Sequence, residues 1–174
     1  MKTISSLFVI ALIFAACQNH DANISETPSS DTTKYPYEFK KVQEWEMNKD
    51  AKNGLTTLNV IKSFENMDTL AMGKLLHDSV WFNLDGYRFK GTKSQFLKDV
   101  TGEFARMRNL KIEMEDMESV INKDKTEEWV SLWYKQVTTT KDGKVDTIQL
   151  YNDFKLKDGK VQGMSEYVQH PMKK

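Results

Sequence analysis

The sequence predicts an α+β domain in which three helices pack on one strongly curved antiparallel sheet. Helical stripes of apolar residues in the first part of the domain predict the helices. Four long segments rich in β-branched and aromatic residues fill the last third of the chain and predict strands. Short polar turns join these segments, and two of the turns read Lys-Asp-Gly-Lys, so we expect an antiparallel meander.

Ahead of the domain, the first sixteen residues have the anatomy of a secretory signal. Lys2 supplies a positive start, residues 7–14 are apolar, and two alanines follow. This apolar run is much shorter than the roughly 20 residues that a membrane-spanning helix needs. Residues 14–17, Phe-Ala-Ala-Cys, resemble a bacterial lipobox, with Phe14 where leucine is usual. The resemblance implies cleavage before Cys17 and a lipid on Cys17. The alternative is an ordinary signal peptide followed by an incidental cysteine.

Residues 17–34 are expected to form a disordered tether that begins at the lipidated Cys17. They are polar, with one isoleucine and no aromatic residue, and such a segment cannot bury enough apolar surface to offset its ordering entropy. The folded domain is therefore expected over residues 35–174, exported and held by lipid at a bacterial membrane, with the outer membrane favoured. Lysine plus arginine and aspartate plus glutamate both number 25, and this balance gives no sign of the basic surface that nucleic-acid binding requires.

Apolar residues spaced three or four apart predict the helical segments. A weak pattern of this kind in residues 35–48 predicts one or two helical turns. A clearer stripe predicts the first full helix, and it consists of Leu55, Leu58, Ile61 and Phe64. Residues 69–77 form the second predicted helix, with Asp68 as its N-cap and with Leu70, Leu75 and Leu76 as its apolar residues. The third opens at Thr92 or Ser94 and runs to about residue 106, and its inward-facing residues are Phe96, Leu97, Val100 and Phe104.

Strands are predicted by β-branched and aromatic runs between turn signals. Residues 80–84 form a short strand, and the Asp-Gly pair at 85–86 is a tight turn into residues 87–90. The four long strands cover residues 110–121, 127–138, 145–156 and 160–169. Strands of about twelve residues exceed the usual five or six, so the sheet must curve strongly.

The two Lys-Asp-Gly-Lys turns set the expected register of the meander. A three-residue hairpin loop puts its glycine in the left-handed conformation and adds a bulge. If both turns are of this kind, Trp133 lies opposite Tyr151 across the first turn, and Asn152 lies opposite Met164 across the second. Two-residue turns would change the register and mix the two faces of the sheet. We favour the bulged loops because they separate apolar from polar residues.

This register predicts a ligand pocket on one face of the sheet and an interface on the other. The pocket residues are Phe82, Tyr134, Leu150, Asn152, Met164 and Glu166. A few polar groups that converge in an apolar cavity are typical of a ligand site, and a buried hydrogen-bond network that only holds the core is an equal alternative. The other face carries Trp129, Trp133, Tyr151 and Tyr167. These aromatic residues are candidates for a dimer interface, or for packing under the N-terminal segment.

The order of these elements resembles the nuclear transport factor 2-like superfamily, which includes SnoaL-like polyketide cyclases and ketosteroid isomerases. The resemblance covers about residues 55–170, and includes Asn-Met-Asp at 66–68 between the helices and Lys-Asp-Gly-Lys-Val at 157–161 before the last strand. It implies a cone-shaped, cystatin-like or SnoaL-like fold with a pocket between the sheet and the helices. It also implies a homodimer, because members often pair through the outer face of the sheet.

Ketosteroid isomerase chemistry needs a carboxylate base and an oxyanion hole made by a tyrosine and a protonated acid. Aligned by the resemblance, the helix tyrosine falls on Val60, the base on Leu84 (or Asn83 after a slip of one residue), and the acid on Asn152. None of these side chains can titrate, so isomerase activity is not expected. Glu166 is a candidate general base, because burial would raise its pKa.

No pattern in the sequence predicts a metal ion or a cofactor. The three histidines, His20, His77 and His170, lack the spacing of metal ligands, and no glycine-rich phosphate loop occurs.

Three hypotheses for the function remain, and we prefer the first. The chain is a membrane-anchored, non-catalytic domain that binds a small apolar ligand or a protein partner. Alternatively, it is a pocket enzyme of the isomerase or cyclase kind with Glu166 as the base, or a structural interaction module that acts through its outer sheet face.

Overall fold

The computed structural model describes residues 36–38 and 44–169. The chain divides after residue 40 into two units, and every element below belongs to the second. In chain order the elements are β1 (Trp45–Met47), α1 (Lys52–Glu65), α2 (Thr69–Leu75), β2 (Leu76–Leu84), β3 (Tyr87–Thr92), α3 (Lys93–Phe104), β4 (Met107–Asn122), β5 (Glu128–Thr140), β6 (Val145–Lys157) and β7 (Lys160–Gln169). The predicted signal peptide, the lipid site at Cys17 and the tether lie outside the described residues.

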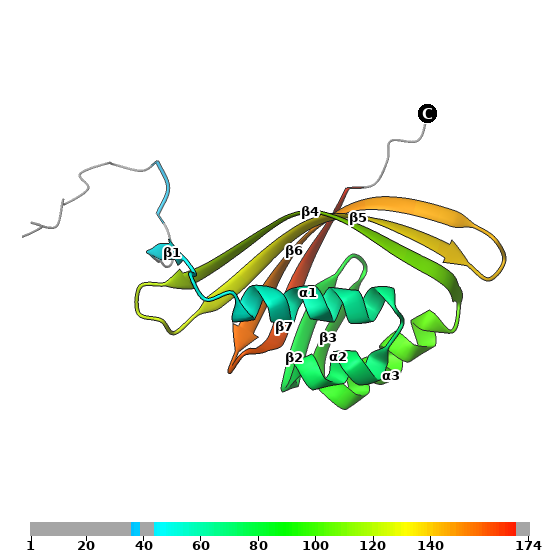
Figure 1. Cartoon of the computed structure of the whole chain (residues 1–174), viewed down its shortest axis with the longest axis horizontal. Coiled ribbons are helices and arrows are strands. Elements are labelled where there is room, and N and C mark those ends of the chain that lie inside the picture. Colours follow the sequence, from blue (N-terminus) through cyan, green and yellow to red (C-terminus); the bar gives the residue numbers. More distant parts are fainter. Residues whose placement is uncertain (1–35, 39–43, 170–174) are drawn as a thin grey trace, which may run out of the picture. The chain divides into compact units, whose positions relative to one another are not determined.

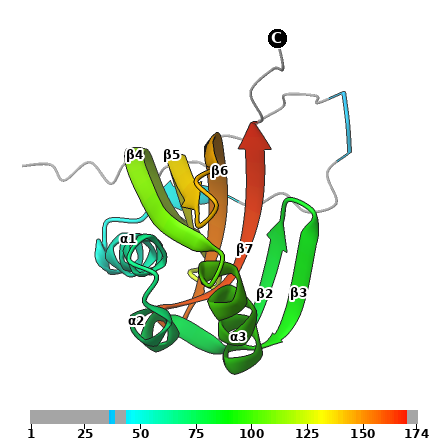
Figure 2. The ribbon, with the colours of Figure 1, turned by 90° about the vertical axis from the view of Figure 1, so that its right-hand side faces the viewer.

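The strands form one seven-stranded sheet in the order β1-β4-β5-β6-β7-β2-β3. All neighbours are antiparallel except β2 and β7, which run parallel. Figure 1 shows the long strands bending over the helices, and Figure 2 shows that α1, α2 and α3 all lie on one side of the sheet. The predicted α+β class, with three helices on a strongly curved and mostly antiparallel sheet, is therefore confirmed.

Local sequence signals explain where α2 and α3 begin. The side chain of Asp68 accepts a hydrogen bond from the backbone N–H of Ala71 (2.9 Å) and caps α2, as predicted. Thr92 and Gln95 form a capping box at the start of α3. These caps satisfy backbone donors that have no partner within the helix, and they fix the point at which each helix leaves the preceding chain.

Two helical predictions are wrong. The helical turns expected in residues 35–48 are not found at the C-terminal end of that range, where Trp45–Met47 form β1 and Trp45 pairs with Asn122 of β4. The second helix ends at Leu75, and Leu76 already belongs to β2. In both cases a ladder with a strand distant in sequence outweighs the local helical spacing. Leu70, one of the apolar residues of this predicted helix, is 81% exposed.

The first Lys-Asp-Gly-Lys turn has the expected geometry. Gly143 adopts a positive φ of 88° in a three-residue loop, and the backbone N–H of Thr140 bonds the carbonyl of Lys144. Trp133 consequently pairs with Tyr151 across β5 and β6, as predicted.

The second turn differs, and the predicted pairing of Asn152 with Met164 is wrong. Asp158 and Gly159 both have positive φ (52° and 69°), which is the signature of a two-residue type I′ turn. The ladder then shifts between Lys155 and Leu156, so that one additional residue of β7 is accommodated. Asn152 therefore pairs with Glu166. Because the combined displacement is two residues beyond the shift, the side chains from Met164 onward keep the face that was predicted for them, whereas Val161, before the shift, lies opposite Leu156 and is buried.

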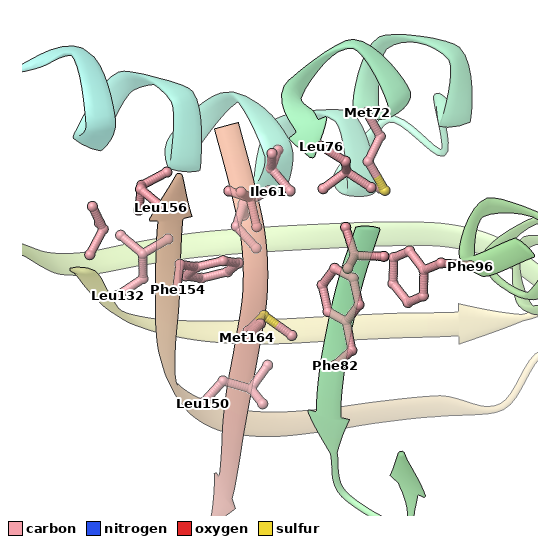
Figure 3. Packing of buried hydrophobic residues seen from close by; sticks show 14 of the residues in the cluster. Ile61, Met72, Leu76, Phe82, Phe96, Leu132, Leu150, Phe154, Leu156 and Met164 are labelled. Atoms are coloured by element: carbon pink, nitrogen blue, oxygen red, sulfur yellow. The ribbon is translucent and has the colours of Figure 1, made fainter. Parts of the chain in front are cut away.

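The core lies between the inner face of the sheet and the helices (Figure 3). Phe82 of β2 stacks on Phe96 of α3 with ring centroids 3.7 Å apart and ring planes 5° apart. The sheet contributes fully buried residues from β5, β6 and β7, which include Leu132, Phe154 and Val161. Among the described residues, no helix is long and apolar enough to cross a membrane.

Candidate ligand cavity

A cavity of about 480 Å³ lies between the inner face of the sheet and the three helices. Thirteen of its twenty lining residues are apolar, and they come from α1, α2, β2, α3, β4, β6 and β7. The polar members are Asp85, Tyr87, Asp99, Glu103, Tyr134, Gln136 and Glu166. This volume and this composition, apolar with a few polar groups, are those of sites that bind small molecules.

Glu166 is the carboxylate that enters this cavity from β7. It is only partly exposed, and its Oε1 accepts a hydrogen bond from the backbone N–H of Asp85 (3.3 Å). Burial raises the pKa of Glu166, and the negative charge of Asp85 raises it further. The hydrogen bond from Asp85 and the side chain of Asn152 act in the opposite direction, because they stabilise the charged form. The net result is a pKa above the usual value for glutamate.

Tyr134 and Asn152 form a buried polar pair beside Glu166. Tyr134 is 2% exposed, and its hydroxyl accepts a hydrogen bond from Nδ2 of Asn152 (2.8 Å). Burial and the charge of Glu166 raise the pKa of Tyr134, so its phenol stays protonated. Nδ2 of Asn152 also contacts the sulfur of Met164 (3.4 Å), whereas its Oδ1 has no hydrogen-bond partner among the described residues.

Four of the six predicted pocket residues line this cavity, namely Phe82, Tyr134, Met164 and Glu166. The other two, Leu150 and Asn152, are fully buried and do not line it. Asn152 lies behind the cavity wall and donates a hydrogen bond to the hydroxyl of Tyr134, which does line the cavity. That these residues bind a ligand stays a prediction.

No family model matches the chain, and a search of curated proteins finds no relative. Solved structures do match. A nuclear transport factor 2-like protein of unknown function from Burkholderia pseudomallei is 10% identical, with a TM-score of 0.56 over 69% of this chain and 92% of that one. An epoxide hydrolase of the LEH-like kind from Mycobacterium tuberculosis is 11% identical, with a TM-score of 0.58 over 70% and 86%.

A third structure, from Catenulispora acidiphila, has a ketosteroid isomerase-like fold and is in complex with trimethylamine. It is 9% identical, with a TM-score of 0.53 over 64% of this chain and 83% of that one. This domain has the nuclear transport factor 2-like fold. At such low identities the likeness extends to the fold alone, so any function must be argued from the residues of the cavity.

The positions that the sequence resemblance aligned with those of an isomerase hold groups that cannot titrate. Val60 and Leu84 line the cavity with aliphatic side chains, and Asn83 is exposed outside it. Asn152 lies behind Tyr134. Glu166 and the exposed carboxyl groups of the wall are therefore the ionisable acids available to this cavity.

The sequence prediction missed the polar residues at the solvent end of the cavity, which are Asp85, Tyr87, Asp99, Glu103 and Gln136. A signal for two of them was present, because Asp99 and Glu103 are four residues apart and adjoin the apolar stripe of α3. The Tyr87 hydroxyl donates a hydrogen bond to Oδ2 of Asp99 (2.6 Å) and so connects β3 to α3. Burial and this carboxylate together raise the pKa of Tyr87 to about 12.

The predicted interface residues lie on the other face of the sheet, in two groups. Trp133, Tyr151 and Tyr167 form a row across β5, β6 and β7, with centroid distances of 4.9 Å and 5.5 Å between successive rings. Trp129 is separate and lies 6.4 Å from the ring of Trp81. Whether this face meets another chain stays a prediction.

The described residues contain no group of three or more histidine, cysteine, aspartate or glutamate side chains that could hold a metal ion.

Proposed function

We propose that the domain binds a small apolar or amphipathic molecule in the cavity, and that lipid on Cys17 holds it at the outside of a bacterial membrane. The cavity carries the binding proposal, because about 480 Å³ of space lined mainly by apolar side chains remains open inside an otherwise well-packed core. The exposed acids and Tyr87 in its wall show that it reaches the surface. A purely structural module would instead be expected to have a closed core.

The binding proposal can be tested on the full chain with Cys17→Ser, which removes the lipid site. Native mass spectrometry after gentle purification is expected to show extra mass that is released on denaturation. Leu84→Trp would fill the open part of the cavity, because Leu84 lines it and is only partly buried. This variant is expected to lose the extra mass.

The matched control is Val145→Trp, which adds the same ring at an exposed position outside the cavity. It is expected to keep the extra mass. A bare Cys17→Ser chain that also fails to take up an apolar fluorescent dye would reject the binding proposal.

The anchoring proposal rests on the lipobox-like residues 14–17. The wild-type chain is expected in the membrane fraction of a bacterial host, labelled by a radioactive fatty acid. Cys17→Ser is expected to be unlabelled and released from the membrane. Labelling that survives in the variant, or a soluble wild-type chain, would contradict lipid attachment at Cys17.

A second candidate function is proton transfer with Glu166 as the general base. Two observations favour it: Glu166 enters an apolar cavity where its pKa is raised, and the protonated Tyr134 phenol lies beside it. Deuterium exchange into a panel of enolisable ketones in heavy water would be followed by NMR. Exchange that is catalysed by the wild type and lost in Glu166→Gln would support the candidate. Equal exchange by both proteins would reject it.

A further inference from the structure

The charged side chains that line the cavity all have the same sign. Among the described residues, all four charged residues that line the cavity are acids, Asp85, Asp99, Glu103 and Glu166, and none is a lysine, arginine or histidine. The whole chain has equal numbers of acidic and basic residues, so composition does not explain this selection. The cavity therefore has a negative potential that its own wall does not balance.

The contacts of these acids indicate where a positive charge would be held. Glu103 already pairs with Arg106 (3.3 Å), and both side chains are exposed to water. Asp99 accepts a hydrogen bond from the neutral Tyr87 hydroxyl, and Glu166 accepts one from the neutral backbone N–H of Asp85. Asp99 and Glu166 are thus bonded to neutral donors, and the charge of Asp85 acts unfavourably on Glu166.

A buried acceptor without a partner lies behind the inner wall of the cavity. Asn152 is 1% exposed and lies against Tyr134 and Met164, which line the cavity, and its Oδ1 receives no hydrogen bond from the described residues. A buried polar atom without a partner is costly unless a ligand or water satisfies it. Because Asn152 lies behind the wall, this oxygen adds a negative partial charge beside Tyr134 and Met164 and does not itself bond a ligand.

Aromatic rings form much of the remaining wall. Six of the lining residues are aromatic, and they are Phe64, Phe82, Tyr87, Phe96, Tyr134 and Phe154. The faces of such rings carry negative electrostatic potential and attract organic cations. A fatty acid or another anionic amphiphile would instead bring a second negative charge beside Glu166.

We propose that the cavity accepts a cationic amphiphile, an organic amine whose protonated or quaternary nitrogen lies near Glu166 and Asp99 and whose apolar body contacts Phe82 and Met164. This inference rests on the proposed binding function and adds the charge of the ligand. Acids of one sign in a largely aromatic and aliphatic wall fit one positive charge on a bulky organic group.

The test compares three probes with the same ten-carbon tail: decyltrimethylammonium, decanol and decanoate. Each is titrated by calorimetry, below its micelle concentration, into the full chain with Cys17→Ser. Decyltrimethylammonium is expected to bind at least tenfold more tightly than decanol, and decanoate is expected to bind most weakly. Glu166→Gln is expected to remove most of the advantage of decyltrimethylammonium over decanol.

Glu115→Gln is the matched control, because it removes the same charge at an exposed position of β4 outside the cavity. It is expected to keep the preference for the cation. Equal binding of the three probes, or tightest binding of decanoate, would overturn the amine proposal and leave the binding proposal standing. If no probe binds and the apolar dye is also excluded, both proposals fail.

Discussion

Glu166 has an environment that makes folding depend on pH. Its pKa is raised in the folded chain, chiefly by burial, so the folded state holds this proton to a higher pH than the unfolded state does. Wherever the folded state binds more protons, stability falls as pH rises. The loss begins near the unfolded value of 4.5 and is complete once the pH has passed the raised folded value.

Glu166→Gln should therefore stabilise the protein at pH 7.5, because glutamine keeps an acceptor for the Asp85 N–H and has no charge to bury. At pH 4 and below, the two proteins should be equally stable with respect to this group. Urea unfolding at both pH values measures the difference. The exposed Glu115→Gln is the control and should show no such pH-dependent gain. A Glu166→Gln effect of the same size at both pH values would contradict the assigned burial cost.

Gly163 is a second residue at which the packing restricts the side chain, because the ring of Trp81 leaves room for glycine only. A Cβ atom at this position would overlap the ring of Trp81, with which Gly163 pairs in register. Gly163→Ala is expected to lower the free energy of unfolding by about 1 to 3 kcal/mol, because the bulky ring must move. Gly102→Ala is the control, since Gly102 lies in α3 with open space around it and should gain up to about 1 kcal/mol. Equal effects of both changes in urea unfolding would refute the close contact.

At the scale of elements, the two Lys-Asp-Gly-Lys turns show how far the sequence determines the fold. The same four residues close a three-residue loop after β5 and a two-residue turn after β6. Both registers place Met164 and Glu166 on the inner face, because the shift in the β6–β7 ladder restores the alternation beyond Gly163. Burial of alternate residues therefore made the faces predictable, whereas it could not distinguish two registers that differ by two residues.

Substitutions at Asp158 can test whether the turn between β6 and β7 is of type I′. Its positive φ is tolerated by aspartate and asparagine and is strongly disfavoured for a β-branched residue. Asp158→Val is expected to lower the free energy of unfolding by about 1 to 2 kcal/mol, and Asp158→Asn by much less. Urea unfolding of both variants measures the effects. If valine and asparagine are equally tolerated, the two-residue type I′ turn is wrong.

Other elements show where prediction from the sequence succeeded or failed. Both helix caps were predictable, because a cap involves neighbours within three residues. β1 was not predictable, because Trp45 forms a strand only by pairing with β4, more than seventy residues away. The acidic end of the cavity was missed because β2, β3 and α3 come together only in the folded chain. Glu166 was found because strand alternation alone places it on the inner face.

At the scale of the whole molecule, we propose that two copies pair through the aromatic row of Trp133, Tyr151 and Tyr167, in which Tyr167 is 56% exposed. Sedimentation of the Cys17→Ser chain is expected to show a dimer. Trp133→Glu is expected to give a folded monomer, because it would bury a charge in the interface. Val145→Glu, exposed at the start of β6, is the control and should remain dimeric. A monomeric parent chain at all concentrations would reject the pairing.

β1 is short and covers only one end of β4, since its three residues pair with residues 120–122. The rest of that long strand has no strand partner on this side among the described residues. An open edge of this kind invites strand addition and aggregation, most of all where many copies share one surface at high local density. Here this edge strand has charged residues at alternate positions, including Lys111, Glu113 and Glu115. The side chain of Glu65 in α1 accepts a hydrogen bond from the backbone N–H of Ile112 (2.9 Å), so this donor is not available to another strand. We expect these features to let molecules crowd together without joining into fibrils.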